Sequence, residues 1–287
     1  MTFYFDSAIP ISLLLTFIFL FVSLPDFKIG MQHIIKSYLK FLWNSKNAHG
    51  VHSPFVFRLV TKCFYDRIYK PEYVVLKEYR KALLNNTNTI SVTDFGAGSK
   101  VFKSDVRAIN KIAKNAGISS KRAQLLFRVA HYFHPKTILE IGTSLGLATS
   151  ALALGNPKAN ITSLEGCPET AGVAEKQLLK YNCNVNIIVT EFENYLKNLP
   201  SYTHYQLIYF DGNHSKEATL NYFELLLPTT TNETVWIFDD IHWSSGMNAA
   251  WKNIKQHPKV TVTIDTFYWG IVFFKREQEK QHFVIRA

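Results

Sequence analysis

Residues 137–146 read TILEIGTSLG, and this stretch decides the fold. A short apolar run rich in β-branched residues passes directly into a turn that holds Gly142 and Gly146. A helical pattern follows over residues 146–154. Glycines between a strand and a helix let the backbone approach a ligand closely. The stretch therefore predicts a strand, a ligand-facing loop and a helix in that order.

The same alternation of strand and helix continues to the C-terminus. Alternating units of this kind imply right-handed crossovers and a parallel sheet. The last two strands have no helix between them, so the final one must run antiparallel. We therefore predict an α/β fold, Rossmann-like, with a seven-stranded mostly parallel sheet and an antiparallel C-terminal strand, preceded by a helical N-terminal region. The predicted strands are 137–141, 161–164, 185–190, 205–210, 234–238, 260–266 and 269–275, and the predicted helices after the first are 168–181, 193–198, 215–227 and 245–256.

Acidic residues stand at or beside the end of each of the first five predicted strands. In an open α/β sheet the ligand binds outside the carboxyl ends of the strands. Unpaired carboxylates gathered at one edge are costly unless a cation or a hydroxyl group partners them. The pattern therefore predicts a ligand site at this edge. The residues concerned are Glu140, Glu165, Glu191, Asp211, Asp239 and Asp240.

Residues 118–287 resemble the class I S-adenosylmethionine (SAM)-dependent methyltransferases, and more narrowly the O-methyltransferase branch that includes the catechol, caffeoyl-CoA and macrocin enzymes. The resemblance is carried by the E-x-G-x-x-x-G loop, the acid after the second strand, the acidic end of the fourth strand and the C-terminal hairpin. Ser144 stands where many members have glycine. The resemblance implies SAM as cofactor. It also implies that the cofactor is bound by Glu140, Gly142, Thr143, Ser144, Gly146, Glu165, Glu191 and Asp211, with Glu165 at the ribose and Glu191 at the adenine.

The resemblance also implies a metal ion and a base. Metal-dependent members hold Mg²⁺ at positions that match Asp211, Asp239 and Asp240, although the usual pair after the fifth strand is Asp-Asn rather than Asp-Asp. Three carboxylates suit Mg²⁺. The alternative is that Asp211 contacts only the cofactor and Asp240 caps the next helix. Catechol-type enzymes carry a lysine base three residues after the fourth-strand Asp. Here that residue is His214, which titrates near neutral pH, and His242 is a second candidate.

We expect a SAM-dependent methyltransferase that acts on a hydroxyl group of a small-molecule acceptor, with catalytic residues His214 and Asp211. The alternatives are methylation of RNA or another macromolecule, or a non-catalytic SAM-binding protein associated with a membrane. Nucleic acid is disfavoured because no Asn/Asp-Pro-Pro-Tyr/Phe motif follows the fourth strand. A nicotinamide dehydrogenase is disfavoured because Ser144 replaces the second glycine of G-x-G-x-x-G. The acceptor and the oligomeric state cannot be derived from the sequence.

The basic excess of the chain lies in its first half. The formal net charge is +10, but residues 1–130 hold 19 Lys and Arg against 7 Asp and Glu, and residues 131–287 hold 13 against 15. Such an excess suits nucleic acid, anionic lipid or an acidic substrate, or is simply a solvated helical surface. We predict helices over 31–45, 54–83 and 118–133. Residues 31–117 form an accessory region, and residues 118–287 form the methyltransferase domain.

Residues 1–30 carry an uncharged segment, 7–25, that is just long enough to span a hydrocarbon layer. Residues 8–24 would then contact a membrane, with the rest of the chain on the cytoplasmic side because lysines follow the segment. Alternatively Met31 is the first translated residue, or the segment is a buried core helix. Three scattered cysteines build no disulfide framework. We therefore expect a cytoplasmic protein, either free or tethered to the inner face of the membrane.

Overall fold

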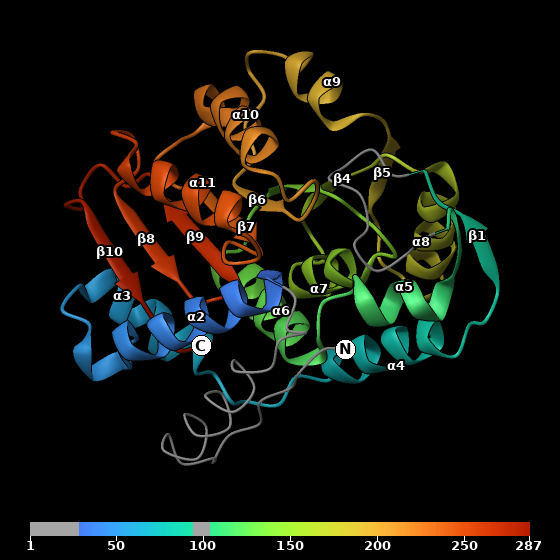
Figure 1. Cartoon of the computed structure of the whole chain (residues 1–287), viewed down its shortest axis with the longest axis horizontal. Helices are drawn as coiled ribbons and strands as arrows, with labels where there is room; N and C mark the ends of the chain where they lie inside the picture. The colour runs from blue at the N-terminus through green and yellow to red at the C-terminus, as the bar shows by residue number, and fades with distance from the viewer. Residues whose placement is uncertain (1–28, 94–103) are drawn as a thin grey trace.

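The computed structural model describes residues 29–93 and 104–287 and is built around an eight-stranded sheet (Figure 1). The strand order is β10-β8-β9-β7-β6-β3-β4-β5. These strands are β3 (Thr137–Ile141), β4 (Asn160–Glu165), β5 (Asn186–Val189), β6 (Leu207–Phe210), β7 (Val235–Asp239), β8 (Val262–Asp265), β9 (Trp269–Phe273) and β10 (Gln281–Val284).

The sheet is mostly parallel, as the sequence predicts. β3 pairs in parallel with β4 and β6, whereas β9 runs antiparallel to both β7 and β8. The carboxyl ends of β3, β4, β6, β7 and β8 therefore lie at one edge, called here the carboxyl edge. The prediction omits β10, which pairs in parallel with β8. Its short sequence QHFV follows a charged turn and lacks the β-branched run that marks the other strands.

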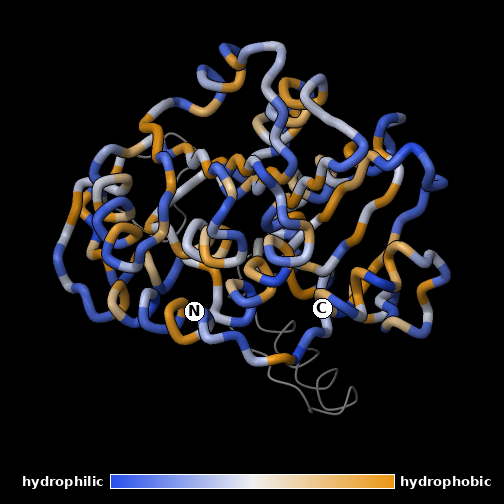
Figure 2. Tube along the Cα trace, turned by 180° about the vertical axis from the view of Figure 1, so that it is seen from behind, coloured by the Kyte–Doolittle hydropathy of each residue, from blue (hydrophilic) through white to orange (hydrophobic). Residues whose placement is uncertain are grey.

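Helices cover both faces of the sheet. One face is covered by α6 (Ser120–Phe133), α7 (Leu147–Gly155) and α8 (Pro168–Lys180). The other face is covered by α9 (Phe192–Lys197), α10 (Lys216–Leu226) and α11 (Ser245–Gln256). Because strand side chains alternate between the faces, neighbours such as Ile138 and Leu139 belong to different hydrophobic clusters. Hydrophobic stretches run through these inner strands and helices, and hydrophilic ones mark the outer loops (Figure 2).

The N-terminal region adds more helices to the first face. They are α3 (Pro54–Leu59), η2 (Val60–Phe64), α4 (Glu72–Leu84) and α5 (Ile109–Asn115), and β1 (Thr89–Ser91) pairs with β2 (Val106–Ala108). Leu59 and Tyr79 share one cluster with Leu126 of α6. The predicted helix 54–83 is interrupted. The Tyr65 N–H bonds the Val60 carbonyl in a π-helical turn, and Pro71, which cannot donate a backbone hydrogen bond, precedes α4.

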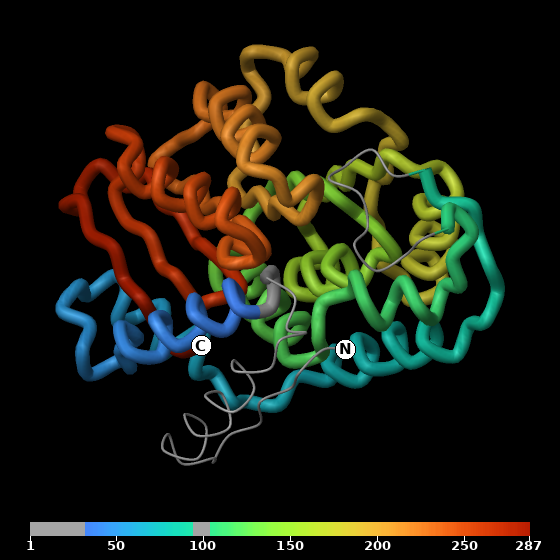
Figure 3. The backbone as a smooth tube through the Cα atoms, in the orientation of Figure 1, coloured from blue at the N-terminus to red at the C-terminus, as the bar shows by residue number. Residues whose placement is uncertain are grey.

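Helix α2 (Ile29–Asn44) lies along the carboxyl edge of β8 and β10 (Figures 1 and 3). Tyr38 and Phe41 pack against Phe267 of the β8–β9 turn, and η1 (Ala48–Gly50) follows. None of the helices within 29–93 and 104–287 is both long and apolar enough to cross a membrane. The predicted membrane segment lies outside the described residues.

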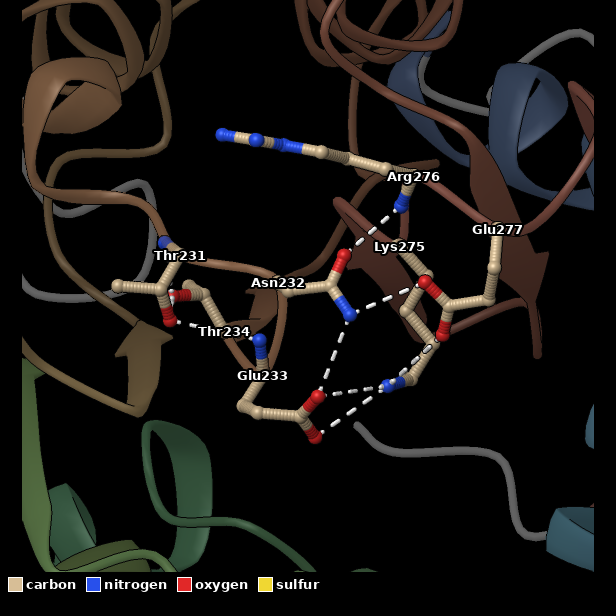
Figure 4. Close-up of polar contacts among 7 residues, drawn as sticks. All are labelled: Thr231, Asn232, Glu233, Thr234, Lys275, Arg276 and Glu277. Carbon is tan, nitrogen blue, oxygen red and sulfur yellow. Dashed lines mark hydrogen bonds and ion pairs between the residues drawn. The ribbon is translucent and has the colours of Figure 1, made fainter.

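The opposite edge of the sheet is joined by an exposed polar network (Figure 4). Lys275, just after β9, lies 3.3 Å from Glu233 and 3.7 Å from Glu277. Asn232 donates to the Glu277 carboxylate at 3.0 Å and accepts from the Arg276 N–H at 2.9 Å. These contacts connect the start of β7 to the end of β9, far from the carboxyl edge.

Candidate cofactor and acceptor site

The loop after β3 is shaped by its two glycines. Gly142 has φ +102°, and a Cβ there would lie 2.6 Å from the Asp211 carbonyl oxygen. Gly146 has φ +76°, and a Cβ there would lie 2.4 Å from the Tyr79 hydroxyl oxygen. Both conformations favour glycine. Gly142 thus lets the loop pass directly against the end of β6, whereas Gly146 makes room for a buried tyrosine of α4.

Glu165 at the end of β4 fixes this loop from the neighbouring strand. Its Oε2 accepts a hydrogen bond from the Ser144 N–H at 2.8 Å, and its Oε1 accepts one from the Cys167 N–H at 3.0 Å. Ser144 adopts the left-handed conformation with φ +47°. The structure therefore brings Glu165 and Ser144 together, as expected for residues that share one ligand.

Glu140 lies beneath the loop in the core. Its Oε2 accepts hydrogen bonds from Thr149 and Ser163, both at 2.5 Å, and Ser163 also bonds Thr143 at 2.5 Å. Burial raises the pKa of Glu140 to about 8, although these hydrogen bonds oppose the shift. Its Oε1 has no hydrogen-bond partner. In this arrangement Glu140 supports the loop, because its bonded oxygen faces α7 and β4.

A cavity of about 460 Å³ lies beside the ends of β4, β5 and β6. Gly166 follows Glu165 into it, Glu191 lines it from the start of α9, and Asn213 lines it from the turn after β6. Three of the predicted strand ends thus meet around one hollow. The side chain of Glu191 is exposed there.

Asp211 and His214 form a pair at the end of β6. His214 Nε2 lies 3.5 Å from Asp211 Oδ1. Burial alone would lower the pKa of His214, but the hydrogen bond with Asp211 and the nearby Asp240 carboxylate raise it to about 9. Burial, with the Asp239 carboxylate beside it, raises the pKa of Asp211. The neighbouring carboxylates therefore favour the protonated form of the imidazole.

Asp239 at the end of β7 is engaged on both of its carboxylate oxygens. Oδ1 pairs with the Arg122 guanidinium and accepts from the Asp240 N–H at 2.8 Å. Oδ2 accepts from the Tyr209 hydroxyl at 3.1 Å. Burial alone would raise the pKa of Asp239. The positive charges of Arg122 and then His214 have the larger effect and hold this pKa below its usual value.

The structure brings the Asp211 and Asp239 carboxylates of the predicted magnesium triad together, with Asp240 near them, but the three do not form a metal-ligating cluster. Within 29–93 and 104–287 no cluster of three or more His, Cys, Asp or Glu side chains could hold a metal ion. The physical reason is that a protein cation, Arg122, already lies against Asp239, so a metal ion would have to displace it. These residues do not fit a Mg²⁺ ion.

His242, the second base candidate, belongs to a network that positions α2. Its Nε2 lies 2.9 Å from Asp265 Oδ2, and its Nδ1 lies 2.5 Å from Asn248 Oδ1. Asn248 Nδ2 in turn lies 3.0 Å from His33 Nε2 on α2. Both ring nitrogens of His242 thus face protein groups, so His214 is the better-placed base.

Arg122 is not among the residues predicted from the sequence. Its guanidinium carbon lies 4.9 Å from the ring centroid of Tyr268 and 5.6 Å from that of Trp269. Of the aromatic run 267–269, only Tyr268 is exposed. One signal was available: Lys121 and Arg122 lie in the first turn of α6, where the helix dipole disfavours positive charge. A basic residue there indicates an acidic partner elsewhere in the fold.

Comparisons with known proteins agree with this architecture. Residues 139–241 match the family model of a methyltransferase domain, and this segment contains the glycine loop, Glu165, Glu191, Asp211 and His214. A comparison with curated protein sequences finds no match.

Solved structures share the fold at low sequence identity. The SAH-bound methyltransferase PaMTH1 of Podospora anserina is 17% identical, with a TM-score of 0.55 over 78% of this chain and 97% of that chain. The O-methyltransferase TomG of Streptomyces achromogenes, solved with SAM, is 14% identical, with a TM-score of 0.51 over 75% and 95%. An O-methyltransferase of Bacillus cereus, solved with SAH, is 17% identical, with a TM-score of 0.50 over 74% and 95%.

Proposed function

From its class I SAM-dependent O-methyltransferase-like fold, we propose that this protein transfers the methyl group of SAM to a hydroxyl group of a small-molecule acceptor. One observation carries the proposal. The Asp211–His214 pair stands at the carboxyl end of β6, and the backbone of Asp211 lies directly against Gly142 of the glycine loop. A base candidate and a cofactor-type loop therefore share one edge of the sheet.

The cavity beside β4, β5 and β6, which Glu191 lines, is where we place the adenine side of the cofactor in this proposal. We assign Glu165 to the ribose hydroxyls, Glu191 to the adenine side, and Gly142, Thr143, Ser144 and Gly146 to the methionine part. When bound, SAM supplies an electrophilic methyl group on a sulfonium. The chain itself needs only to align the acceptor, exclude water and manage one proton, because methyl transfer is an in-line displacement.

His214 is the group we assign to that proton. Asp211 orients the ring through Nε2. The other ring nitrogen, Nδ1, accepts the proton of the acceptor hydroxyl, and Asp211 stabilises the imidazolium that forms. With a pKa of about 9, His214 must first lose a proton to the solvent. A second positive charge close by, such as a sulfonium, favours that loss. Mg²⁺ has no part in this scheme, because Arg122 lies against Asp239.

Calorimetric titration of SAM into the full chain tests the cofactor assignment. Micromolar binding is expected, and it should be unchanged by EDTA. Glu165→Gln should weaken it at least tenfold, because the amide offers one acceptor oxygen in place of two. Glu175→Gln, an exposed change on α8, is the matched control. Absence of binding by a folded protein would contradict the proposal.

Turnover tests the chemistry separately. Incubation with methyl-labelled SAM and a panel of small hydroxyl compounds should release SAH with at least one acceptor. His214→Gln should slow that release on the order of 100-fold while leaving SAM binding intact. A variant that binds SAM normally and still methylates at the full rate would exclude His214 as the base.

A further inference from the structure

Large side chains stand exposed on the N-terminal region, away from the candidate site. Trp43 near the end of α2 is 90% exposed. In the turn between η2 and α4, Ile68 is 68% exposed and Tyr69 is 67% exposed. Transferring such apolar area out of water is favourable, so exposed side chains of this kind indicate a contact surface where several of them lie together.

These side chains lie on connected parts of the chain. Lys46, which follows α2, is bridged to Ile285, and the Arg286 N–H bonds the Lys46 carbonyl at 3.3 Å. The Tyr65 hydroxyl in turn donates to the Arg286 carbonyl at 2.9 Å. The C-terminal tail therefore links the end of α2 to the turn that carries Ile68 and Tyr69.

Helix α3 and η2 lead directly into this turn, and their outer side is basic. Arg58 and Lys62 are one helical turn apart and exposed, whereas Leu59 and Cys63 beside them are buried. The aromatic–basic face is defined here as Trp43, Arg58, Lys62, Tyr65, Ile68 and Tyr69.

The charge around this face is almost entirely positive. Residues 36–70 contain seven Lys and Arg and a single acidic residue, Asp66. That carboxylate lies 3.6 Å from Lys70 and is thereby partly neutralised. The other six cations, which are Lys36, Lys40, Lys46, Arg58, Lys62 and Arg67, are all exposed.

We propose that the aromatic–basic face docks on an anionic membrane surface. Tryptophan and tyrosine favour the headgroup level, and lysine and arginine are attracted to anionic lipid. The exposed aliphatic side chain of Ile68 favours lipid over nucleic acid, because it can enter the acyl boundary but cannot stack on a base. Two copies of the chain would bring like charges together on this face, so a second copy fits it less well.

The first experiment locates Trp43 relative to lipid. Full-chain protein is mixed with vesicles of brominated phosphatidylcholine and phosphatidylserine, and quenching of tryptophan emission by the bromine is measured. Quenching is expected in the unchanged protein and should be lost in Trp43→Phe. Trp243→Phe is the matched control, because Trp243 follows β7 at the candidate site, and it should keep the quenching. This readout reports Trp43 itself, whatever residues 1–28 do.

The second experiment tests the charge. Each basic residue near an anionic leaflet contributes about fivefold in affinity. The double change Arg58→Gln with Lys62→Gln should therefore weaken co-sedimentation with phosphatidylserine vesicles on the order of 25-fold. Lys252→Gln with Lys259→Gln, at exposed positions in and after α11, should have little effect. Vesicles of phosphatidylcholine alone should bind the unchanged protein weakly.

Three results would overturn the proposal. The first is co-sedimentation without quenching of Trp43, which would mean that another surface faces the lipid. The second is quenching of Trp43 by a single-stranded oligonucleotide but not by vesicles, which would assign the face to nucleic acid. The third is a change in Trp43 emission with protein concentration in the absence of lipid, which would assign the face to a second copy. Far-ultraviolet circular dichroism and urea denaturation of each variant show that it is folded.

Discussion

Two ion-pair clusters stand at opposite edges of the same sheet. At the carboxyl edge, Arg122 pairs with Asp239, whose side chain is 3% exposed. At the other edge, Lys275 pairs with Glu233, whose side chain is 69% exposed. The two cations are themselves similarly covered, so the clusters differ mainly in the environment of the carboxylates.

The exposure of the carboxylates distinguishes a site that can perform chemistry from an ion-pair network on the surface. Water screens Glu233 and Glu277, so their pairing with Lys275 has little effect beyond local order. Asp239, Asp211 and Asp240 share a buried space with two cationic groups, Arg122 and His214, and every pKa there depends on its neighbours. In the exposed network the pKa of Glu277 is lowered, first by a backbone hydrogen bond and then by Asn232. In the buried cluster burial itself is the largest influence, and it opposes the charge of each carboxylate.

Removing Arg122 should give the largest of the expected effects, a loss of folding stability. Arg122→Met leaves Asp239 buried without its counter-ion, and breaking such a pair typically costs about 3–5 kcal/mol. The free energy of unfolding, measured by urea denaturation, should fall by that order. A loss under about 1 kcal/mol would show that the pair is screened as at the surface.

The same variant also tests the metal conclusion. With Arg122 removed, Asp239 becomes available as a ligand, and Mg²⁺ should raise the melting temperature of Arg122→Met but leave that of the unchanged protein unaltered. Equal stabilisation of both proteins would mean that Arg122 does not exclude the ion.

A substitution at His214 should give the next largest effect, a fall in the rate of methyl transfer. Its pKa of about 9 means that the neutral imidazole, the form that acts as base, increases as the pH rises toward 9. Methyl transfer should rise over the same range, and His214→Gln should lower its plateau on the order of 100-fold. NMR titration of the ring checks the cause: Asp211→Asn removes the charge that raises the pKa, so the pKa should fall. A rate that is independent of pH between 7 and about 9 would contradict the assignment.

Titration of Glu140 should make the free energy of unfolding depend on pH. Its pKa is about 8 in the folded protein against an ordinary 4.5, so the folded state binds more protons than the unfolded state between these values. Stability should therefore fall as the pH rises through this window, by at most about 1.4 kcal/mol per pH unit from this group. Glu140→Gln should remove that slope, and Glu175→Gln should keep it. Urea denaturation at several pH values measures it, and parallel slopes in all three proteins would contradict the prediction.

Local patterns predicted the sheet because each buried parallel strand carries its own signal. Runs such as TILEI at β3 are apolar and β-branched, and each run ends at a turn. The gathering of the carboxylates could also be predicted, because parallel strands place their carboxyl ends at one edge of the sheet. β10 escaped prediction because its sequence QHFV, in which His282 is exposed and the other residues are half-buried, has neither a long apolar run nor a following helix.

The partners of those carboxylates could not be predicted in the same way. Arg122 and Asp239 are separated by 117 residues, and nothing local to Asp239 indicates whether a metal ion or a guanidinium lies against it. The break near residue 65 was missed for a related reason, because the apolar spacing of 54–83 continues through a π-helical turn whose geometry depends on packing. The type of a secondary-structure element can be predicted from the local sequence, whereas the partner of a charged side chain depends on the tertiary fold.

A substitution at Lys275 should give the smallest loss of folding stability. Lys275→Met keeps the apolar stem beside Phe55, whose ring centroid lies 5.5 Å from the ammonium, and removes only the charge. Exposed pairs contribute about 0–1 kcal/mol, and added salt should reduce the loss further because dissolved ions screen exposed charges. The substitution is the same one made at Arg122, so urea denaturation of both variants compares the two edges directly. If Lys275→Met costs as much as Arg122→Met, burial of the carboxylate is not what distinguishes them. If it costs far less, the buried carboxylates at the carboxyl edge account for the difference.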